Sequence, residues 1–84
     1  MQYNTEFFEK LVTEFVTGYM AVSGEYFANT YDSAERVEVI RQVTQAAFTY
    51  AHALTRMYQC GASADEVVAE AARKGWEYVP TIGG

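Results

Sequence analysis

The sequence predicts an all-α protein of three helices, and three observations support this fold class. Apolar residues recur every three or four positions over most of the chain, which is the spacing of one face of a helix. Residue types that cap helices stand before each apolar stretch, and glycines follow two of them. The chain has 84 residues, which fits one domain over residues 1–84. A domain this small has a thin margin of stability.

The first helix is predicted over residues 5–28. Asn4 and Thr5 are capping types, and the acid Glu6 follows where the helix dipole favours a negative charge. Apolar residues then come in pairs four positions apart, a spacing that excludes a strand. Ser23-Gly24 could end the helix, but the spacing continues beyond it. We therefore expect one helix to pass through Gly24, with a kink there as the alternative.

The second helix is predicted over residues 33–60. Asp32 and Glu35 stand three positions apart, as in a capping box, and Gly61 has the character of the residue that follows a helix. A helix of about 27 residues is ~40 Å long. Its predicted apolar ridge consists of Val37, Ile40, Val43, Ala47, Tyr50, Leu54 and Met57.

The third helix is predicted over residues 64–74. Ser63 and Glu66 have the spacing of a second capping box, and Gly75 is read as the helix end. An extended aromatic tail from Trp76 follows, since Pro80 disfavours helix at the residue before it. We expect the first two helices to form a long antiparallel hairpin, with the third as a short lid.

The predicted helix lengths indicate self-association. A compact domain of this length has a diameter of about 30 Å, whereas the two long helices would approach 36–40 Å at ~1.5 Å per residue. An elongated hairpin would leave apolar surface for another chain, so a homodimer through helix 1 or 2 is expected. A bent, compact monomer is the alternative.

Composition indicates the compartment. The chain has no apolar run of 18 residues and no basic, apolar segment at its start, so we expect a soluble protein without a membrane span or signal peptide. Cys60 and His52 are the single cysteine and histidine, which leaves no disulfide within the chain and no thiolate metal site. A reducing cytoplasm is the expected location, that of the host if the protein is phage-encoded.

Residues with catalytic character are few. His52 has no carboxylate three or four positions away to orient it, and Cys60 lies at the carboxyl end of a helix, where the dipole disfavours a reactive thiolate. No nucleotide-binding, hydrolase or metalloprotease motif is present. We expect no catalytic, cofactor-binding or metal-binding residues, no cofactor, and no enzyme activity.

The negative charge is uneven. Residues 1–40 hold seven acids and two bases, whereas residues 41–84 hold four of each, so the net charge of −5 belongs to the first half. Such a surface disfavours nucleic acid and anionic lipid and favours a basic protein.

Aromatic residues are interleaved with these acids at the amino terminus and around the link between helices 1 and 2. Tyrosine is enriched where interfaces bind most strongly, and an acidic rim steers a basic partner. The alternative is that these rings close the end of the core. The candidate protein-interaction residues are Tyr3, Glu25, Tyr26, Phe27, Tyr31, Asp32 and Glu35.

These observations lead to a hypothesis of a small, acidic, non-enzymatic interaction module that binds a larger protein and modulates it, most simply by inhibition. Inhibitors encoded by phages or mobile elements, such as anti-CRISPR and other anti-defence proteins, share this general character, although no motif carries the likeness. Two alternatives remain. One is a small dimeric helix-turn-helix DNA-binding regulator using residues 57–76, whose second helix begins with acids. The other is a structural subunit of a larger assembly.

Overall fold

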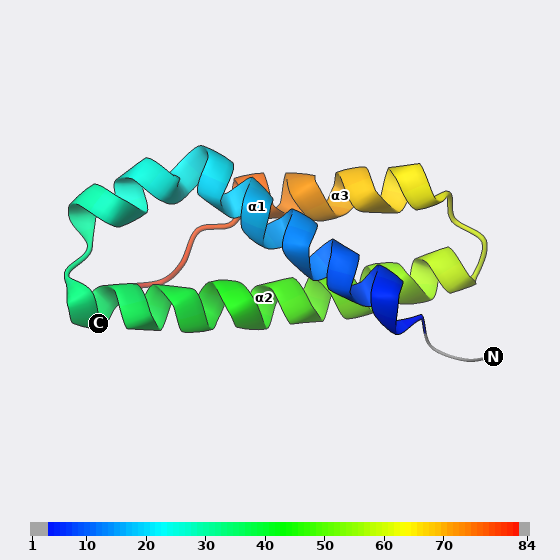
Figure 1. Ribbon diagram of the computed structural model, residues 1–84, viewed down its shortest axis with the longest axis horizontal. Helices are drawn as coiled ribbons and strands as arrows, with labels where there is room; N and C mark the ends of the chain where they lie inside the picture. Colours follow the sequence, from blue (N-terminus) through cyan, green and yellow to red (C-terminus); the bar gives the residue numbers. More distant parts are fainter. Residues whose placement is uncertain (1–3, 83–84) are drawn as a thin grey trace.

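The computed structural model describes residues 4–82 and confirms the all-α fold. Three helices follow one another: α1 (Thr5–Thr30), α2 (Ser33–Gln59) and α3 (Ala64–Glu77), and residues 4–82 contain no strand. The molecule is elongated, with extents of 43 × 20 × 19 Å (Figure 1). The two long helices are thus longer than a compact domain of this size is wide, as predicted. In addition, α1 bends along its length (Figure 1).

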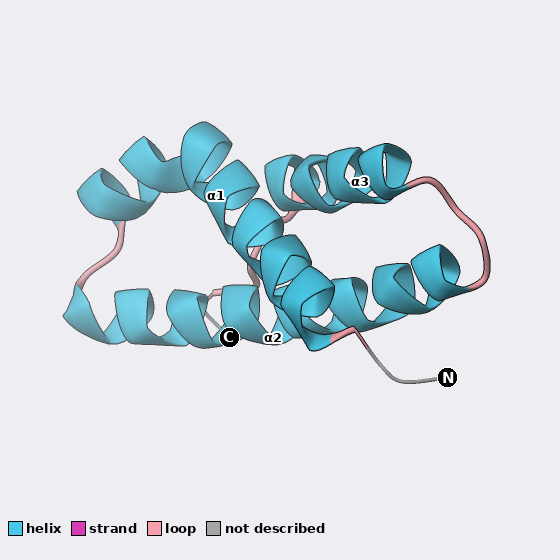
Figure 2. Cartoon of the chain, turned by 45° about the vertical axis from the view of Figure 1, so that its right-hand side comes forward, coloured by secondary structure: helices cyan, strands magenta, loops and turns pink. Residues whose placement is uncertain are grey.

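The helices run antiparallel in sequence order, and α1 lies diagonally across the other two (Figure 1). Figure 2 shows the same crossing from a second direction. The contact of α1 with α3 is more extensive than its contact with α2, and α2 and α3 contact each other least. The short α3 is therefore a full packing partner of α1 rather than a lid on a hairpin.

Local capping chemistry sets most helix boundaries. The Asn4 side chain accepts a hydrogen bond from the Phe7 amide at 3.0 Å, and Asp32 and Glu35 form the predicted reciprocal capping box. Gly61 has φ of 112°, a left-handed conformation that glycine adopts without strain, directly after α2.

The capping box predicted at Ser63 was wrong. Ser63 does precede α3, but its side chain makes no capping hydrogen bond. Its main-chain carbonyl accepts from the Val67 amide at 3.0 Å, so the first turn forms through the backbone alone.

The helix ends differ from prediction by one to three residues. α1 runs two residues further than expected, through Gly24 to Thr30, and α2 ends one residue earlier at Gln59. α3 runs three residues further, to Glu77, because Gly75 is an interior position buried against α1 and does not end the helix. The tail consequently begins at Tyr78 rather than at Trp76.

The core consists of two clusters along the long axis. The first joins all three helices, and the second joins α1, α2 and the tail, whose Tyr78 and Ile82 pack against it. The buried members are Leu11, Ala51, Leu54, Val67 and Ala71 in the first cluster, and Phe15, Tyr19, Val39, Val43 and Ala47 in the second.

The predicted α2 ridge is only partly buried. Val43, Ala47 and Leu54 lie in the core, but Ile40 and Met57 are more than half exposed. Val37, which was also assigned to the ridge, is 69% exposed. The diagonal course of α1 and the shortness of α3 explain this, because they cover different sides of α2 along its length.

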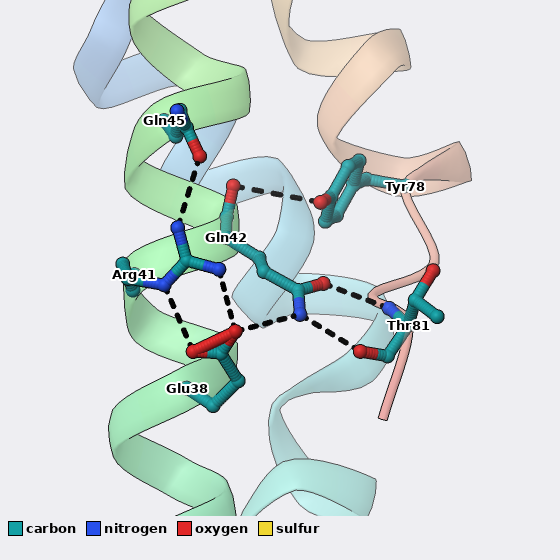
Figure 3. A network of polar contacts seen from close by, with 6 residues as sticks. All are labelled: Glu38, Arg41, Gln42, Gln45, Tyr78 and Thr81. Carbon is teal, nitrogen blue, oxygen red and sulfur yellow. Dashed lines mark hydrogen bonds and ion pairs between the residues drawn. The ribbon is translucent and has the colours of Figure 1, made fainter. Parts of the chain in front are cut away.

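The Gln42 side chain holds the tail against α2 (Figure 3). The Gln42 amide donates to the Thr81 carbonyl at 2.7 Å and accepts from the Thr81 amide at 2.8 Å. Gln42 also donates to Glu38 at 3.3 Å, and Glu38 in turn pairs with Arg41. The Tyr78 hydroxyl reaches the Gln42 carbonyl at 3.5 Å, so the tail closes over the second cluster.

Within residues 4–82, no helix combines the length and the apolar character that a membrane crossing requires.

Candidate protein-interaction surface

Six of the seven predicted interaction residues lie together at the junction of α1 and α2, at the end of the molecule opposite the start of α1 (Figure 1). Tyr3 lies outside the described residues. The other six occupy the last turns of α1, the link, and the first turn of α2; they are Glu25, Tyr26, Phe27, Tyr31, Asp32 and Glu35.

The rings at this junction divide into core and surface. Tyr31 is central, with its ring edge-to-face against Phe27 at 6.1 Å and against Tyr26 at 5.5 Å. Phe27 and Tyr31 are half-buried against the second core cluster, as the alternative interpretation expected. Tyr26 is 59% exposed, so it is the ring of this set that a partner could contact. Burial, then Tyr26 and Glu35, raise the pKa of the Tyr31 hydroxyl above its usual value.

The acids at this junction also fall into two groups, those that cap α2 and one that is unpaired. Asp32 and Glu35 cap α2 by accepting main-chain hydrogen bonds of 2.8 and 2.9 Å. Arg36 donates to the Ala28 carbonyl at 2.6 Å and so fastens the end of α1. Glu25 is exposed and has no hydrogen bond or ion pair with any residue of the range 4–82. It is therefore the acid of the set whose charge remains available.

Sequence reasoning missed the aromatic residue that completes this surface. Trp76, 50% exposed, is carried by the last turn of α3 and rests on α1 at Gly18, where an added Cβ would lie 3.1 Å from the indole Cδ1. Val22 and Tyr26 follow Gly18 at intervals of four, so they continue the same side of α1. The last turn of α3 contacts α1 at Gly18, and Val22, one turn further along α1, is 62% exposed.

We refer to the surface formed by Glu14, Val22, Glu25, Tyr26 and Trp76 as the Trp–Tyr face. The prediction that the third helix ends at Gly75 placed Trp76 in a tail. The contact between Trp76 and Gly18 of α1 was therefore not predicted. The spacing of Val67, Ala71, Gly75 and Tyr78 was the available signal, since it continues one helical face.

The charge of this face is negative. Glu14 lies one turn before Gly18 on α1 and, like Glu25, pairs with no cation of residues 4–82. The nearby Glu77 is already bound to Arg73 at 2.7 Å. The face thus combines two exposed rings with two uncompensated carboxylates.

Grooves lie outside this face in residues 4–82, and two of them are lined mainly by apolar side chains. One, of about 290 Å³ between α1 and α2, is lined by Val16, Tyr19, Met20, Phe27, Val39, Ile40, Val43 and Thr44, none of them charged. The other, of about 410 Å³ between α2 and α3, includes the pair Glu70 and Lys74 in its lining. Lys74 lies 5.4 Å from the centre of the Tyr50 ring across this groove. The hydrogen bond from Arg73, then its charge and that of Lys74, lowers the pKa of Glu70.

The remaining residues with chemical character are dispersed. Cys60 is exposed at the end of α2. Residues 4–82 contain no group of three His, Cys, Asp or Glu side chains placed to hold a metal ion. In the segment proposed as helix-turn-helix, the first turn of α3 presents Asp65 and Glu66, both exposed, where a recognition helix approaches DNA bases.

Comparisons with protein families, with characterised proteins and with solved structures found no match to this chain.

Proposed function

We propose that this protein is a non-enzymatic interaction module that binds a larger protein with a basic surface through the Trp–Tyr face. The observation that carries the proposal is the exposure of Trp76 and Tyr26 on the outside of packed helices, beside the unpaired acids Glu14 and Glu25. Tryptophan and tyrosine are the residue types that contribute most to binding at interfaces.

The rings are held in place before any partner arrives. Tyr26 is supported by the Tyr31 ring and Trp76 by the main chain of α1 at Gly18. Rings fixed on helices lose little conformational freedom on binding, which favours affinity. The acids act at longer range, since they raise the rate of encounter with a basic surface and oppose acidic partners.

The effect on the larger protein is proposed to be inhibition by covering a functional surface. The small size of the chain, 84 residues, and the exposed aromatic side chains of the Trp–Tyr face support blocking rather than catalysis. Phage or mobile-element origin, as for anti-CRISPR proteins, and a cytoplasmic place of action belong to the same proposal and rest on composition alone.

We further propose that the acting form is a homodimer. Its support is the elongated shape, 43 Å in length, with large apolar side chains exposed along α2.

The test is affinity purification from the native host with the wild type and two variants, followed by mass spectrometry. One variant, W76A/Y26A, removes both rings. The control, Met57→Ala, removes an apolar side chain of similar exposure (54%) in the groove between α2 and α3. A stoichiometric protein retained by wild type and control but lost by W76A/Y26A would support the proposal.

The alternatives give different outcomes. Recovery of the same partner by all three proteins would reject the Trp–Tyr face. Specific DNA binding by the purified protein, weakening steeply with salt, would replace the proposal by the helix-turn-helix regulator. A higher oligomer whose size does not depend on concentration would favour a structural subunit.

A further inference from the structure

The tail, residues 78–82, is anchored to the second core cluster by two apolar side chains. The Tyr78 ring packs edge-to-face against Phe15 at 5.8 Å and against Tyr19 at 6.2 Å. Ile82, four residues further on, packs against the same cluster. The tail is therefore held at its two ends by an aromatic ring and a branched aliphatic side chain.

Between these anchors, one side chain of α2 binds the main chain of the tail. The Gln42 carboxamide donates to the Thr81 carbonyl at 2.7 Å and accepts from the Thr81 amide at 2.8 Å (Figure 3). Residues of paired antiparallel strands exchange the same two bonds, so Gln42 takes the place of a neighbouring strand. Because both bonds involve main-chain atoms of Thr81, they select a peptide backbone and not a particular side chain.

The tail can leave this position while the helices stay packed. Val79 is 79% exposed and Thr81 is exposed, so the bonds of the tail are solvated. Segments with few buried contacts and exposed hydrogen bonds open locally at a lower free energy than global unfolding. Among the described residues, the first core cluster, which joins all three helices, includes none of the tail.

The tail fills only part of the groove in which it lies. A space of about 320 Å³ continues along α2 beside the Tyr78 ring. It is lined by Gln42, Gln45, Ala46, Thr49, Tyr50 and Tyr78, none of them charged. Displacement of the tail would join this space to the places that Tyr78 and Ile82 now occupy, which gives a continuous groove of carboxamide, hydroxyl and apolar groups.

We propose that the groove beneath the tail is a binding site for a non-helical segment of another protein, and that the tail covers this site in the free chain. The tail itself defines the chemistry of the occupant. Phe15 and Tyr19 take an aromatic ring, and the place of Ile82 takes an aliphatic side chain four residues further on. Gln42 takes a main-chain amide and carbonyl between them.

The tail then sets a threshold for binding. A tethered segment competes at an effective concentration of about a millimolar, so a free segment of similar affinity is excluded until the tail opens. Charged side chains are disfavoured at the two anchor positions, because burying an unpaired charge there is costly. The site shares no residue with the Trp–Tyr face, and binding at one surface does not require the other.

The first test uses a fluorescein-labelled peptide with the sequence of residues 77–82 and measures its binding by fluorescence anisotropy. The full chain is compared with its variant Y78A/I82A, whose own tail has lost both anchors. We expect Y78A/I82A to bind the peptide at least tenfold more tightly than the wild type does, because its own tail no longer competes. A control peptide with alanine at positions 78 and 82 should bind neither protein.

Two further variants test the role of Gln42 in the groove. Gln42→Ala added to Y78A/I82A should weaken peptide binding at least threefold, since both bonds to the peptide main chain are lost. The matched control is Gln45→Ala in the same background. Gln45 has the same side chain one turn further along α2 and makes no hydrogen bond with Thr81, so binding should be unchanged.

The second test uses the wild type alone and does not depend on the folding of a variant. Amide hydrogen exchange at Thr81 should be at least tenfold faster than at Val43 of the core, because the tail opens without global unfolding. Equal protection of the two amides would show that the tail opens only when the protein unfolds, and would overturn its role as a cover.

The binding measurements can overturn the site directly. A folded Y78A/I82A, judged by its helical circular dichroism signal, that fails to bind the tail peptide would exclude a peptide-binding groove. Equal binding of the alanine control peptide, or no effect of Gln42→Ala, would remove the proposed recognition chemistry. None of these results bears on the Trp–Tyr face, which is measured separately with W76A/Y26A.

Discussion

Gly75 of α3 lies directly against the main chain of α1 at Phe15. A side-chain carbon at Gly75 would overlap the Phe15 carbonyl oxygen and stand 2.9 Å from the Tyr19 amide nitrogen. One turn away on α1, a side-chain carbon at Gly18 would lie 2.5 Å from the Ala72 carbonyl oxygen. The two helices thus meet backbone to backbone at a pair of glycines, and this approach brings Trp76 onto α1.

We predict that Gly75→Ala destabilises the protein by at least about 1–3 kcal/mol, the usual cost of overpacking a core. The obstacle is main chain on a neighbouring helix, which cannot move aside as a side chain can. Gly24→Ala is the matched control, since its new carbon would lie an ordinary 3.5 Å from Met20. That variant should gain about 0.5–1 kcal/mol from the better helix propensity of alanine.

Urea unfolding followed by circular dichroism measures both changes. Equal stability of Gly75→Ala and the wild type would show that the helices do not approach this closely.

The tail should depend on Gln42. We predict that Gln42→Ala costs about 0.5 kcal/mol for each of the two hydrogen bonds lost to Thr81, at the lower end of the usual range because the site is exposed. Amide exchange at Thr81 should accelerate more than that of the core. Gln45→Ala is the control, because Gln45 accepts a hydrogen bond from Arg41 at 3.2 Å and makes none with Thr81. Similar protection of Thr81 in both variants would contradict the role of Gln42.

Low pH should reduce the stability that Glu38, next to Gln42, contributes to the fold. Hydrogen bonds from Arg41 and then Gln42 lower the pKa of Glu38 to about 2 in the folded protein. A depressed folded pKa stabilises the protein at neutral pH, and this contribution is lost as pH falls from the unfolded value near 4.5 toward 2. The effect should be small because Glu38 is solvated.

A carbon-detected NMR titration of the Glu38 carboxyl measures this pKa directly. Between pH 4.5 and 2, the free energy of unfolding of Glu38→Gln should fall less than that of the wild type. A midpoint of about 4.5 for Glu38 would show that the ion pair is absent in solution.

Alkali should act on the second core cluster. Burial, then Tyr31 and Tyr78, raise the pKa of Tyr19, whose side chain is almost fully buried. A raised folded pKa means that the neutral hydroxyl stabilises the fold below pH 10 and that this contribution is lost as pH rises through the folded pKa. Tyr19→Phe should therefore lose less stability than the wild type above pH 10. Identical alkaline unfolding of the two proteins would contradict the prediction.

Local features of the fold could be predicted from the sequence, and long-range ones could not. The capping box of Asp32 and Glu35 and the left-handed Gly61 are determined by neighbours in the chain, and both were confirmed. Gly75 was misread because the same residue type ends helices and permits close helix packing. Only the presence of α1 opposite Gly75 separates the two meanings.

In the candidate surface, too, the residues placed by local sequence could be predicted and those placed by long-range packing could not. Tyr26 and Glu25 could be named from composition near the α1–α2 link, since their neighbours in sequence are their neighbours in space. Trp76 could not, because its place depends on where α3 crosses α1. Val37 and Ile40 have the spacing of core residues, but the diagonal course of α1 leaves them exposed.

The support of Trp76 by Gly18 can be tested without any partner. Trp76 is the single tryptophan of the chain, so its fluorescence reports this position alone. In Gly18→Ala the new carbon would stand 3.1 Å from the indole Cδ1, closer than ordinary contact, and would also press on the Ala72 carbonyl. We predict that the indole moves outward, with emission shifted to longer wavelength and a weaker near-ultraviolet circular dichroism signal. Gly24→Ala, whose new carbon lies next to Met20, should leave both signals unchanged. If Gly18→Ala also leaves them unchanged, the indole does not rest on α1, and the Trp–Tyr face loses the residue that joins its two helices.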